Sequence, residues 1–401
     1  MKLPIADSLK KLKNTKQRLR IAVLNRVFSP TGGGAERYSI ALVEQLSHLH
    51  DIHVFAQKID HECPRVTYHR VSMPMEKPRW INQLWFSAAT WWATRRGFDV
   101  VHSHENTWHG DVQTVHVLPV KYNLFHRSVS KHLILQMIKV ITSPRLLTYL
   151  FLERIRYGYQ VGKHVVLTSV SLQAVMTESY PTCNKMLSVI TPGVTIPQLP
   201  VFPEKKIEAR KILGLPKHGV CLLFVGNDYQ KKGLQTLLEA LRLLPNDVVL
   251  AVVGNSTKST TFRKQVHLLS IQDRVFFLGA LKDMSPAYEA ADCLVHPTRE
   301  DTFAMVVLEA MAYGLPVIVS SAKYCGISNL LQHGINAMIL DEPKDTNNLV
   351  IFLKKILEEK SIRKQLEHGA IAFASNYEWQ KIALKQEAIY FSVVAEKKVV
   401  N

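Results

Sequence analysis

Two carboxylates eight positions apart, Asp301 and Glu309, form the pattern in this sequence best suited to chemistry. Between and beyond them, residues 303–313 have helical spacing before Gly314 stops the run. If both acids lay on one helix, they would be about 12 Å apart along its axis, a span that suits an extended ligand. Backbone amides at the start of such a helix would suit a phosphate group. An ordinary acidic helix start is the alternative, since acids favour the first turn.

This segment closely resembles the acid-x7-acid signature of the retaining glycosyltransferases of family 4. The resemblance implies an α/β protein of the GT-B fold, with two Rossmann-like doubly wound domains facing across a cleft. It also implies that the first acid orients the donor sugar and that Glu309 holds the ribose of the nucleotide. Asp301 stands where most members have Glu, and its neighbour Glu300 leaves a one-residue ambiguity. The diphosphate contacts would come from the intervening residues Thr302, Phe303, Ala304 and Met305.

A glycine-rich turn, residues 32–34, lies between the first predicted strand and the first predicted helix. Glycines allow backbone amides to approach a phosphate closely, and a helix N-terminus favours negative charge. The turn is neither G-x-G-x-x-G nor a Walker P-loop. It resembles the Gly-Gly turn of family 4 enzymes, so Gly33 and Gly34 are implied donor-binding residues. A plain glycine turn is the alternative.

Residues 225–233 occupy the same topological position in the second predicted domain and contain the adjacent pair Lys231 and Lys232. Two ammonium groups beside a diphosphate would neutralise the charge that develops on a leaving group. The pair resembles that of the lipopolysaccharide core glucosyltransferases, although Asn227 stands where the wider family commonly has Arg. Solvated surface lysines are the alternative.

His116 follows an apolar strand at roughly the place where many family members keep a histidine near the anomeric carbon. The resemblance thus implies a catalytic role for His116, beside Asp301 and Lys232; a structural histidine is the alternative. Glu105 and Asp111 are lesser candidates for acceptor contacts. No two aspartates stand two positions apart, so the sequence has no D-x-D pattern for Mg²⁺ or Mn²⁺. We expect no metal and no cofactor.

Fifty basic and thirty-three acidic residues give a net charge of +17, which calls for a polyanionic partner. Residues 112–152 contain no acid, and their basic residues alternate with large apolar clusters. Such alternation describes an amphipathic surface better than a nucleic-acid groove. We therefore expect peripheral contact with anionic membrane through residues 1–20 and 112–160, and no nucleic acid. A mobile basic loop beside a buried helix is the alternative.

The five cysteines are scattered and form no C-x-x-C pair, which indicates reduced thiols of the cytoplasm. The sequence has no run of eighteen apolar residues and no signal-peptide pattern at its N-terminus. These features predict a cytoplasmic protein, with possible peripheral attachment to the inner face of the membrane.

Strands alternating with helices predict parallel sheets covered on both faces. The length of 401 residues favours two domains. We expect a basic tail at 1–19, an acceptor domain at 20–190, a donor domain at 191–375, and a C-terminal helix at 376–401 that returns to the first domain, as the resemblance implies. Predicted strands fall at 20–25, 52–57, 99–104, 111–116, 162–169, 220–225, 248–253, 274–278, 293–296 and 316–319. Predicted helices fall at 35–49, 172–179, 233–244, 258–269, 285–291 and 303–313.

The resemblance implies transfer of a hexose, with retention, from a nucleotide-diphosphate sugar to a hydroxyl of a glycan or glycolipid. UDP-glucose is the first expected donor, ahead of other UDP-hexoses and GDP-mannose, and lipopolysaccharide core or related cell-surface polysaccharide synthesis is the expected setting. Two alternatives remain open. A sugar-nucleotide epimerase would share the fold and the donor, and a non-catalytic relative that binds anionic membrane would explain the charge without turnover.

Overall fold

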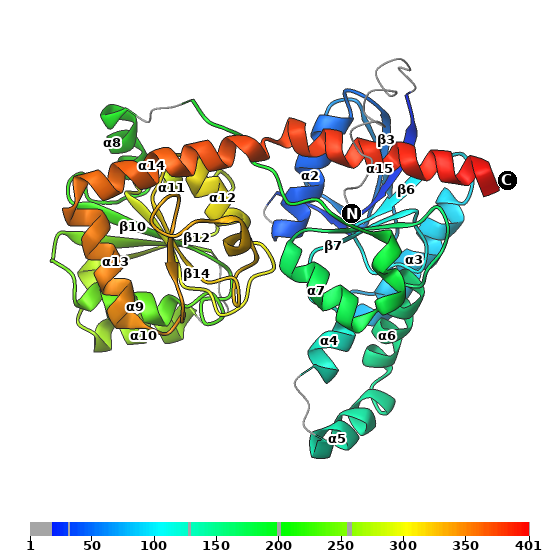
Figure 1. Cartoon of the computed structure of the whole chain (residues 1–401), viewed down its shortest axis with the longest axis horizontal. Coiled ribbons are helices and arrows are strands. Elements are labelled where there is room, and N and C mark those ends of the chain that lie inside the picture. The colour runs from blue at the N-terminus through cyan, green and yellow to red at the C-terminus, as the bar shows by residue number, and fades with distance from the viewer. Residues whose placement is uncertain (1–17, 31–32, 127–129, 199–201, 255–258, 401) are drawn as a thin grey trace. The chain divides into compact units, whose positions relative to one another are not determined.

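The computed structural model describes residues 18–30, 33–126, 130–198, 202–254 and 259–400. The chain divides into two compact units (Figure 1). Unit 1 comprises Met1–Thr191 together with Trp379–Asn401, and unit 2 comprises Pro192–Glu378. The predicted basic tail lies outside the described residues except for residues 18 and 19. None of the helices described is long and apolar enough to cross a membrane.

Unit 1 is built on a seven-stranded parallel sheet of order β5-β3-β1-β6-β7-β8-β9. Its strands are β1 (Arg20–Leu24), β3 (Asp51–Ala56), β5 (Val66–Arg70), β6 (Val100–Ser103), β7 (Val112–Val115), β8 (His164–Leu167) and β9 (Leu187–Val189). A separate two-stranded sheet pairs β2 (Val27–Phe28) with β4 (Lys58–Ile59). The inner strands are buried on both faces, as parallel sheets covered by helices require.

Three helices of unit 1 alternate with its strands along the chain, and a fourth comes from the C-terminal end of the sequence. The first three are α2 (Gly34–Leu46), α3 (Arg79–Thr94) and α7 (Val170–Ser179), which is followed by the 3-10 helix η2 (Pro181–Met186). The last is α15 (Trp379–Val400), which packs against α2 and β6. The final helix therefore completes the first unit.

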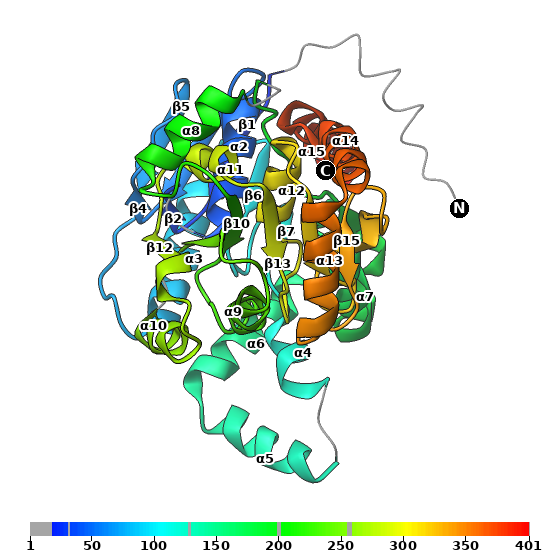
Figure 2. The same ribbon diagram turned by 90° about the vertical axis from the view of Figure 1, so that its left-hand side faces the viewer.

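Three helices fill the connection between β7 and β8, where the sequence predicted one amphipathic segment. They are α4 (Val120–Phe125), α5 (Ser130–Ile141) and α6 (Pro144–Arg156). Pro144 opens α6, and the Ser143 side chain accepts from the amide of Leu146, so the helix starts with a favourable residue and a cap. Helix α5 packs on α6 and lies at the end of unit 1 that points away from the sheet (Figures 1 and 2).

Unit 2 contains a six-stranded parallel sheet of order β12-β11-β10-β13-β14-β15. Its strands are β10 (Val220–Val225), β11 (Val248–Val253), β12 (Val275–Gly279), β13 (Cys293–His296), β14 (Val317–Ser320) and β15 (Met338–Leu340). Its helices are α8 (Pro203–Ile212), α9 (Leu234–Arg242), α10 (Ser259–Leu268), η3 (Gln272–Arg274), α11 (Ser285–Ala290), α12 (Met305–Ala312), η4 (Gly326–Leu330), α13 (Thr346–Glu358), α14 (Lys360–Ala374) and η5 (Ser375–Tyr377).

Both sheets have the doubly wound order of a Rossmann-like domain, in which strand order reverses beside the first strand. In unit 1 the reversal lies between β1 and β6, and in unit 2 it lies between β10 and β13. The predicted α/β class with two Rossmann-like domains is confirmed. Ligands of such sheets bind outside the carboxyl ends of the strands at this reversal.

Candidate functional site

The loops after β10 and β13 meet at the strand-order reversal of unit 2. The first carries Lys231 and Lys232, and the second carries Glu300 and Asp301. Two hydrogen bonds join the loops: the amide of Arg299 donates to the carbonyl of Lys231 at 2.8 Å, and the Thr298 hydroxyl donates to the same carbonyl at 3.3 Å. The loops therefore form one rigid surface for the charged side chains.

Gly233 makes this close approach possible. It has φ +81° at the start of α9, and a Cβ placed on it would lie 1.9 Å from the carbonyl oxygen of Pro297. Any other residue would meet both the left-handed backbone and this collision. The lysine pair is thereby held directly against the end of β13.

Each lysine pairs with one of the acids. Lys231 Nζ lies 2.6 Å from Glu300 Oε1, and these two side chains are about half exposed. Lys232 Nζ pairs with Asp301 Oδ2 and also donates to the Glu300 carbonyl at 3.4 Å. The Asp301 side chain is only 16% exposed, against 49% for Glu300. The cluster thus consists of an inner, mostly buried ion pair and an outer, solvated one.

The Asp301 carboxylate is saturated with hydrogen bonds. Its Oδ1 accepts from the amides of Ala304 at 2.9 Å and Phe303 at 3.3 Å, and its Oδ2 accepts from His296 Nε2 at 3.2 Å as well as from Lys232. Burial alone would raise the pKa of Asp301, but the His296 hydrogen bond and the Lys232 charge outweigh it and lower that pKa below its usual range. Asp301 is therefore held as a carboxylate.

The start of the acidic helix differs from the prediction. Helix α12 begins at Met305, because Ala304 adopts a left-handed conformation with φ +71°. Asp301 precedes the helix and forms a backbone bridge with Cys325, so the two acids do not lie on one helix, and the axial span considered for that case does not apply. Two of the amides between the acids are already bound by Asp301 itself. The helix geometry leaves the amides of Met305 and Val306 without an intrahelical acceptor.

The remaining predicted donor residues have distinct surroundings. Glu309 is half-buried in α12, and its Oε2 accepts a 2.5 Å hydrogen bond from the Tyr288 hydroxyl of α11. The side chains of Phe303 and Ala304 belong to the core of unit 2, so only their backbone faces the loop. Thr302 is half-buried, and Met305 packs partly against the same core.

His296, the last residue of β13, is a member of the cluster that sequence reasoning missed. It is buried, and burial lowers its pKa, so it is neutral and donates Nε2–H to Asp301. Its Nδ1 has no hydrogen-bond partner among the described residues. The signal was present in the sequence, because a histidine that ends a buried strand five positions before Asp301 falls at the ligand-binding edge of the sheet.

In unit 1, Gly33 and Gly34 lie at the N-terminus of α2, as predicted. Gly33 is the N-cap with extended backbone and no side-chain cap, and its carbonyl accepts from Arg37. The first-turn amides of α2 thus have no capping side chain from Gly33, a feature suited to an anion. Gly32, which completes the glycine turn, lies outside the described residues.

His116 belongs to a packed histidine cluster and does not stand alone after its strand. Its Nε2 lies 3.0 Å from His104 Nδ1, and the Tyr38 ring packs edge-on at 5.1 Å. His102 lies beneath His104 at 4.3 Å between ring centroids and bonds to Tyr390 of α15 at 2.7 Å. Burial lowers the pKa of His116 to about 3, so its imidazole is neutral.

The two lesser candidates have structural partners. Glu105 follows β6. Its carboxylate accepts hydrogen bonds from the backbone amide of Arg26 at 3.1 Å and from Arg26 Nε at 2.9 Å. Asp111 lies at the amino end of β7, where it accepts from the amide of Val101 and pairs with Lys397 of α15, each at 2.7 Å. Ligands of such sheets bind at the carboxyl ends of the strands, so the position of Asp111 does not favour its candidate role in acceptor binding.

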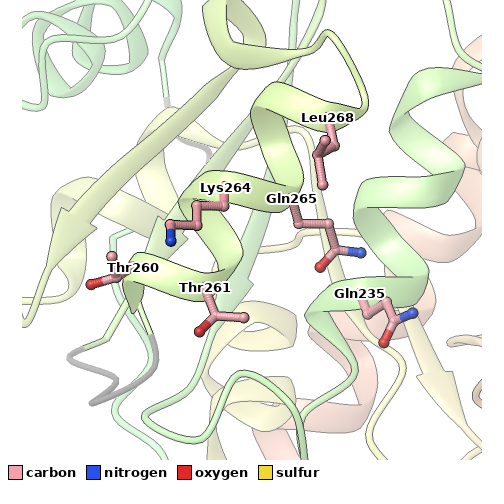
Figure 3. Close-up of a pocket in the computed structure, with 6 residues that line it drawn as sticks. All are labelled: Gln235, Thr260, Thr261, Lys264, Gln265 and Leu268. Atoms are coloured by element: carbon pink, nitrogen blue, oxygen red, sulfur yellow. The ribbon is translucent and has the colours of Figure 1, made fainter.

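Figure 3 shows a pocket elsewhere in unit 2, formed by α9 and α10. It is lined by Gln235, Thr260, Thr261, Lys264, Gln265 and Leu268. This pocket shares no residue with the lysine–acid cluster and contains no carboxylate. We do not assign it to the functional site.

Two Rossmann-like units, each with its strand-order reversal beside the first strand, have the architecture of the GT-B fold. Comparison with protein families agrees with this. The family described as Glycosyltransferase Family 4 matches residues 32–196, and the family described as Glycosyl transferases group 1 matches residues 205–373. The chain therefore belongs to the family 4 glycosyltransferases.

Individual relatives are distant. A D-inositol 3-phosphate glycosyltransferase of Corynebacterium diphtheriae is 29% identical over 54% of this chain and 52% of its own length. The lipopolysaccharide glucosyltransferase WaaG of Escherichia coli is 26% identical over 55% of this chain and 60% of its own. The chain thus aligns with about half, or slightly more, of the length of these curated relatives.

Solved structures share the fold over nearly the whole chain. A crystal structure of WaaG superposes with a TM-score of 0.78 at 21% identity and covers 92% of this chain and 99% of that one. A structure of HepE from Anabaena, in complex with UDP and glucose, superposes with a TM-score of 0.70 at 18% identity and covers 92% and 98%. These likenesses establish the fold.

Proposed function

We propose that this protein transfers a hexose from a nucleotide-diphosphate sugar to a hydroxyl of a glycan or glycolipid, with retention at the anomeric carbon. The observation that carries the proposal is the cluster of Lys231, Lys232, Glu300 and Asp301 at the strand-order reversal of unit 2. Unit 2 would bind the donor, and unit 1 would bind the acceptor.

The cluster suits a diphosphate because its charges balance in the absence of ligand. Two lysines face two carboxylates, so neither sign is in excess. A diphosphate that approaches the lysines would replace Glu300 as the partner of Lys231, since this outer pair is solvated and contributes only about 0–1 kcal/mol. Lys232 would stay close to Asp301 and offer its remaining N–H bond to the same phosphate. The two ammonium groups would then stabilise the leaving group.

Asp301, Glu300 and Glu309 would each contact a different part of the donor. Asp301, fixed by His296 and two amides, would position the lysine and the loop, and a sugar hydroxyl would replace one of its present hydrogen-bond donors. Glu300, about half exposed, is free to turn toward the sugar once Lys231 binds phosphate. Glu309 would bind the ribose through the carboxylate that Tyr288 orients.

The reaction proposed for these groups breaks the bond between the anomeric carbon and the diphosphate oxygen and forms a bond from that carbon to the acceptor oxygen. The acceptor proton passes to the departing phosphate, so no protein nucleophile is needed. The lysines and the first-turn amides of α12 supply the positive charge, and we propose that the reaction needs no metal ion. His116, neutral and half-buried in unit 1, would lie beside the sugar rather than act as an acid at neutral pH.

UDP-glucose is the donor we propose first. The WaaG relative is a glucosyltransferase of lipopolysaccharide, and the HepE structure holds UDP and glucose. Lys231 and Lys232 match the adjacent basic pair expected of such enzymes. A lipid-linked acceptor of the lipopolysaccharide core, or a related cell-surface glycan, follows from the same resemblance.

The surface of α5 and α6 supports an acceptor held in a membrane. Leu135, Met137, Ile138 and Ile141 of α5 are each more than half exposed, and Phe151 of α6 is 57% exposed. Lys139 and Arg145 lie within or beside this apolar surface. Large apolar side chains next to cations suit the interface of an anionic bilayer. We therefore propose peripheral attachment at the cytoplasmic face of the membrane.

A donor panel tests the proposed function. The purified full chain is incubated with UDP- and GDP-hexoses, with and without extracted core glycolipid, and nucleotide release and sugar isomerisation are measured in the presence of a chelator. Acceptor-dependent release of UDP is the expected result. Isomerisation without release would replace the proposal with an epimerase, and a folded protein that neither binds nor uses any donor would be a non-catalytic relative.

A variant pair tests the ribose assignment. Glu309→Gln removes the carboxylate charge but keeps its size, and Tyr288→Phe removes only the hydroxyl that orients it. We expect Glu309→Gln to weaken UDP binding by about tenfold or more, since a hydrogen bond to a charged group contributes about 1.5–3 kcal/mol. Tyr288→Phe should have a smaller effect. Full activity of Glu309→Gln would overturn the assignment.

A further inference from the structure

Three side chains with metal-binding atoms converge on the surface of unit 1, outside the residues assigned to glycosyl transfer. Glu44 comes from the last turns of α2, and His61 and Cys63 come from the loop between β4 and β5. Their ligand atoms all lie within 4.8 Å of one another. Within the described part of the chain, this is the one group of three or more such residues with that geometry.

The distances fit a small tetrahedral ion. His61 Nε2 lies 3.0 Å from Glu44 Oε1, and Cys63 Sγ lies 3.9 Å from the same oxygen. Ligands at about 2.0–2.3 Å from Zn²⁺ in tetrahedral geometry would lie about 3.3–3.6 Å apart. These two separations lie within a few tenths of an ångström of this range, and the third, between the His61 ring nitrogen and Cys63 Sγ, is at most 4.8 Å. Small movements of the three side chains therefore bring their ligand atoms toward tetrahedral positions.

The loop that supplies two of the ligands is held in place by other contacts. The Cys63 amide donates to the Tyr68 hydroxyl at 2.7 Å, and Tyr68 packs edge-on against Phe28. The Cys63 side chain is buried, whereas the His61 and Glu44 side chains are 33% and 45% exposed. A sulfur ligand thus lies at the bottom of the group, and the open side faces solvent, where water completes the fourth position.

We propose that Glu44, His61 and Cys63 bind a divalent transition-metal ion, with Zn²⁺ the best match. A thiolate, an imidazole and a carboxylate are the three protein ligand types that Zn²⁺ accepts. The ion binds as the Cys63 thiol releases its proton to solvent and His61 releases any hydrogen bond to Glu44. The site joins the end of α2 to the β4–β5 loop and has no part in glycosyl transfer.

Cobalt(II) provides the first test, because it replaces Zn²⁺ and reports its ligands by absorption. The full chain, stripped with a chelator and kept reduced, is titrated with Co²⁺ and then with Zn²⁺. We expect one equivalent of Co²⁺ to produce a thiolate-to-cobalt charge-transfer band and visible bands of tetrahedral intensity, both abolished by Zn²⁺. No thiolate band in the wild-type protein would overturn the proposal.

Matched variants separate this site from adventitious binding. Cys63→Ser and His61→Gln should each weaken Zn²⁺ binding by more than about tenfold, measured by competition with a chromophoric chelator. Cys183→Ser removes another buried thiol of unit 1, and His126→Gln removes another His–Glu pair, in which Nδ1 lies 2.6 Å from Glu178. Both controls should keep wild-type affinity. Equal loss in variants and controls would contradict the assignment.

A chemical readout keeps the test valid if Cys63→Ser fails to fold. In the wild-type protein, Zn²⁺ should slow alkylation of Cys63 relative to Cys183, as followed by mass spectrometry of peptides. It should also raise the midpoint of thermal unfolding, because a ligand that binds only the folded state stabilises it. Equal alkylation rates with and without Zn²⁺ would show that Cys63 is not a ligand.

Discussion

The histidine cluster of unit 1 should make this unit lose stability steeply as pH falls below neutrality. Burial, with smaller contributions from His116 and Arg156, lowers the pKa of His102 to about 3. Burial likewise lowers the pKa of His116 to about 3 and that of His104 well below its ordinary value of 6.5. His102 and His116 are therefore neutral in the folded protein at any pH above about 4, and His104 is neutral at neutral pH.

The sign and size of the effect follow from proton linkage. Between pH 6.5 and about 3, the unfolded chain binds protons on these histidines that the folded chain does not, so stability falls as pH falls. The contribution is fully present above pH 6.5 and is lost progressively toward the lowered values. Each histidine contributes about 1.4 kcal/mol per pH unit, so three together cost about 4 kcal/mol at one unit below 6.5.

Tryptophan fluorescence can follow unit 1 by itself, because all six tryptophans belong to it: Trp80, Trp85, Trp91, Trp92, Trp108 and Trp379. Urea unfolding at about pH 7.5 and about pH 5.5 should give free energies of unfolding that differ by at least about 4 kcal/mol, with an unchanged dependence on urea. His109 of the same unit, whose pKa burial lowers to about 4, adds to the contribution of the cluster.

His102→Gln tests whether the pH dependence of stability comes from the histidine cluster. Glutamine can keep hydrogen bonds to Tyr390 and Thr114, the present partners of His102 at 2.7 Å, but it does not titrate. The difference between the two pH values should shrink by about 1.4 kcal/mol relative to His48→Gln, a substitution of an exposed histidine in the same unit. A difference below about 1 kcal/mol in the wild-type protein, or equal pH dependence in both variants, would refute the reasoning.

Three further predictions concern the site, the backbone and the membrane surface. Lys232→Ala should weaken UDP binding by about 30-fold, measured by calorimetry, because a charge-assisted hydrogen bond contributes about 2 kcal/mol; unchanged affinity would remove Lys232 from the site. Gly233→Ala should lower the urea midpoint far more than Gly214→Ala, since both have positive φ but only Gly233 meets a neighbouring atom, and equal shifts would show that the collision relaxes. Ile138→Asp should weaken binding to anionic vesicles, measured by co-sedimentation, by about 30-fold, because about 2 kcal/mol of apolar burial is lost. Leu268→Asp in unit 2 should leave this binding unchanged. Equal binding of both variants would show that α5 does not contact the membrane.

The central strands of both sheets could be predicted from the sequence. β10 and β11 are short runs of β-branched and large apolar residues that end at turn residues, and such runs are typical of strands in a parallel sheet covered on both faces. The edge strands β5 and β9 were not predicted. Their residues are only partly buried, so they lack the continuous apolar character of the central strands.

The charged residues of the candidate site could also be predicted, but their arrangement could not. The spacing of Asp301 from Glu309 and the adjacent lysines are visible in the sequence. The left-handed backbone at Ala304 is not, because alanine gives no local signal for positive φ. That conformation precedes α12, and the amides of Phe303 and Ala304 donate to Asp301. The backbone of Asp301 is itself paired with the later segment at Tyr324 and Cys325, a contact that the local sequence does not reveal.

Helix α15 has a consequence for the order in which the protein can fold during synthesis. Its Tyr390 bonds to His102, its Lys397 pairs with Asp111, and its Glu396 binds His164 and the amide of Gly162. All of these partners leave the ribosome long before residues 379–400 do. Unit 2, continuous in sequence from 192 to 378, can therefore fold while unit 1 still lacks its last helix. The first unit to be translated is the last to be completed, and until then the histidine-lined side of its sheet needs protection from other nascent chains.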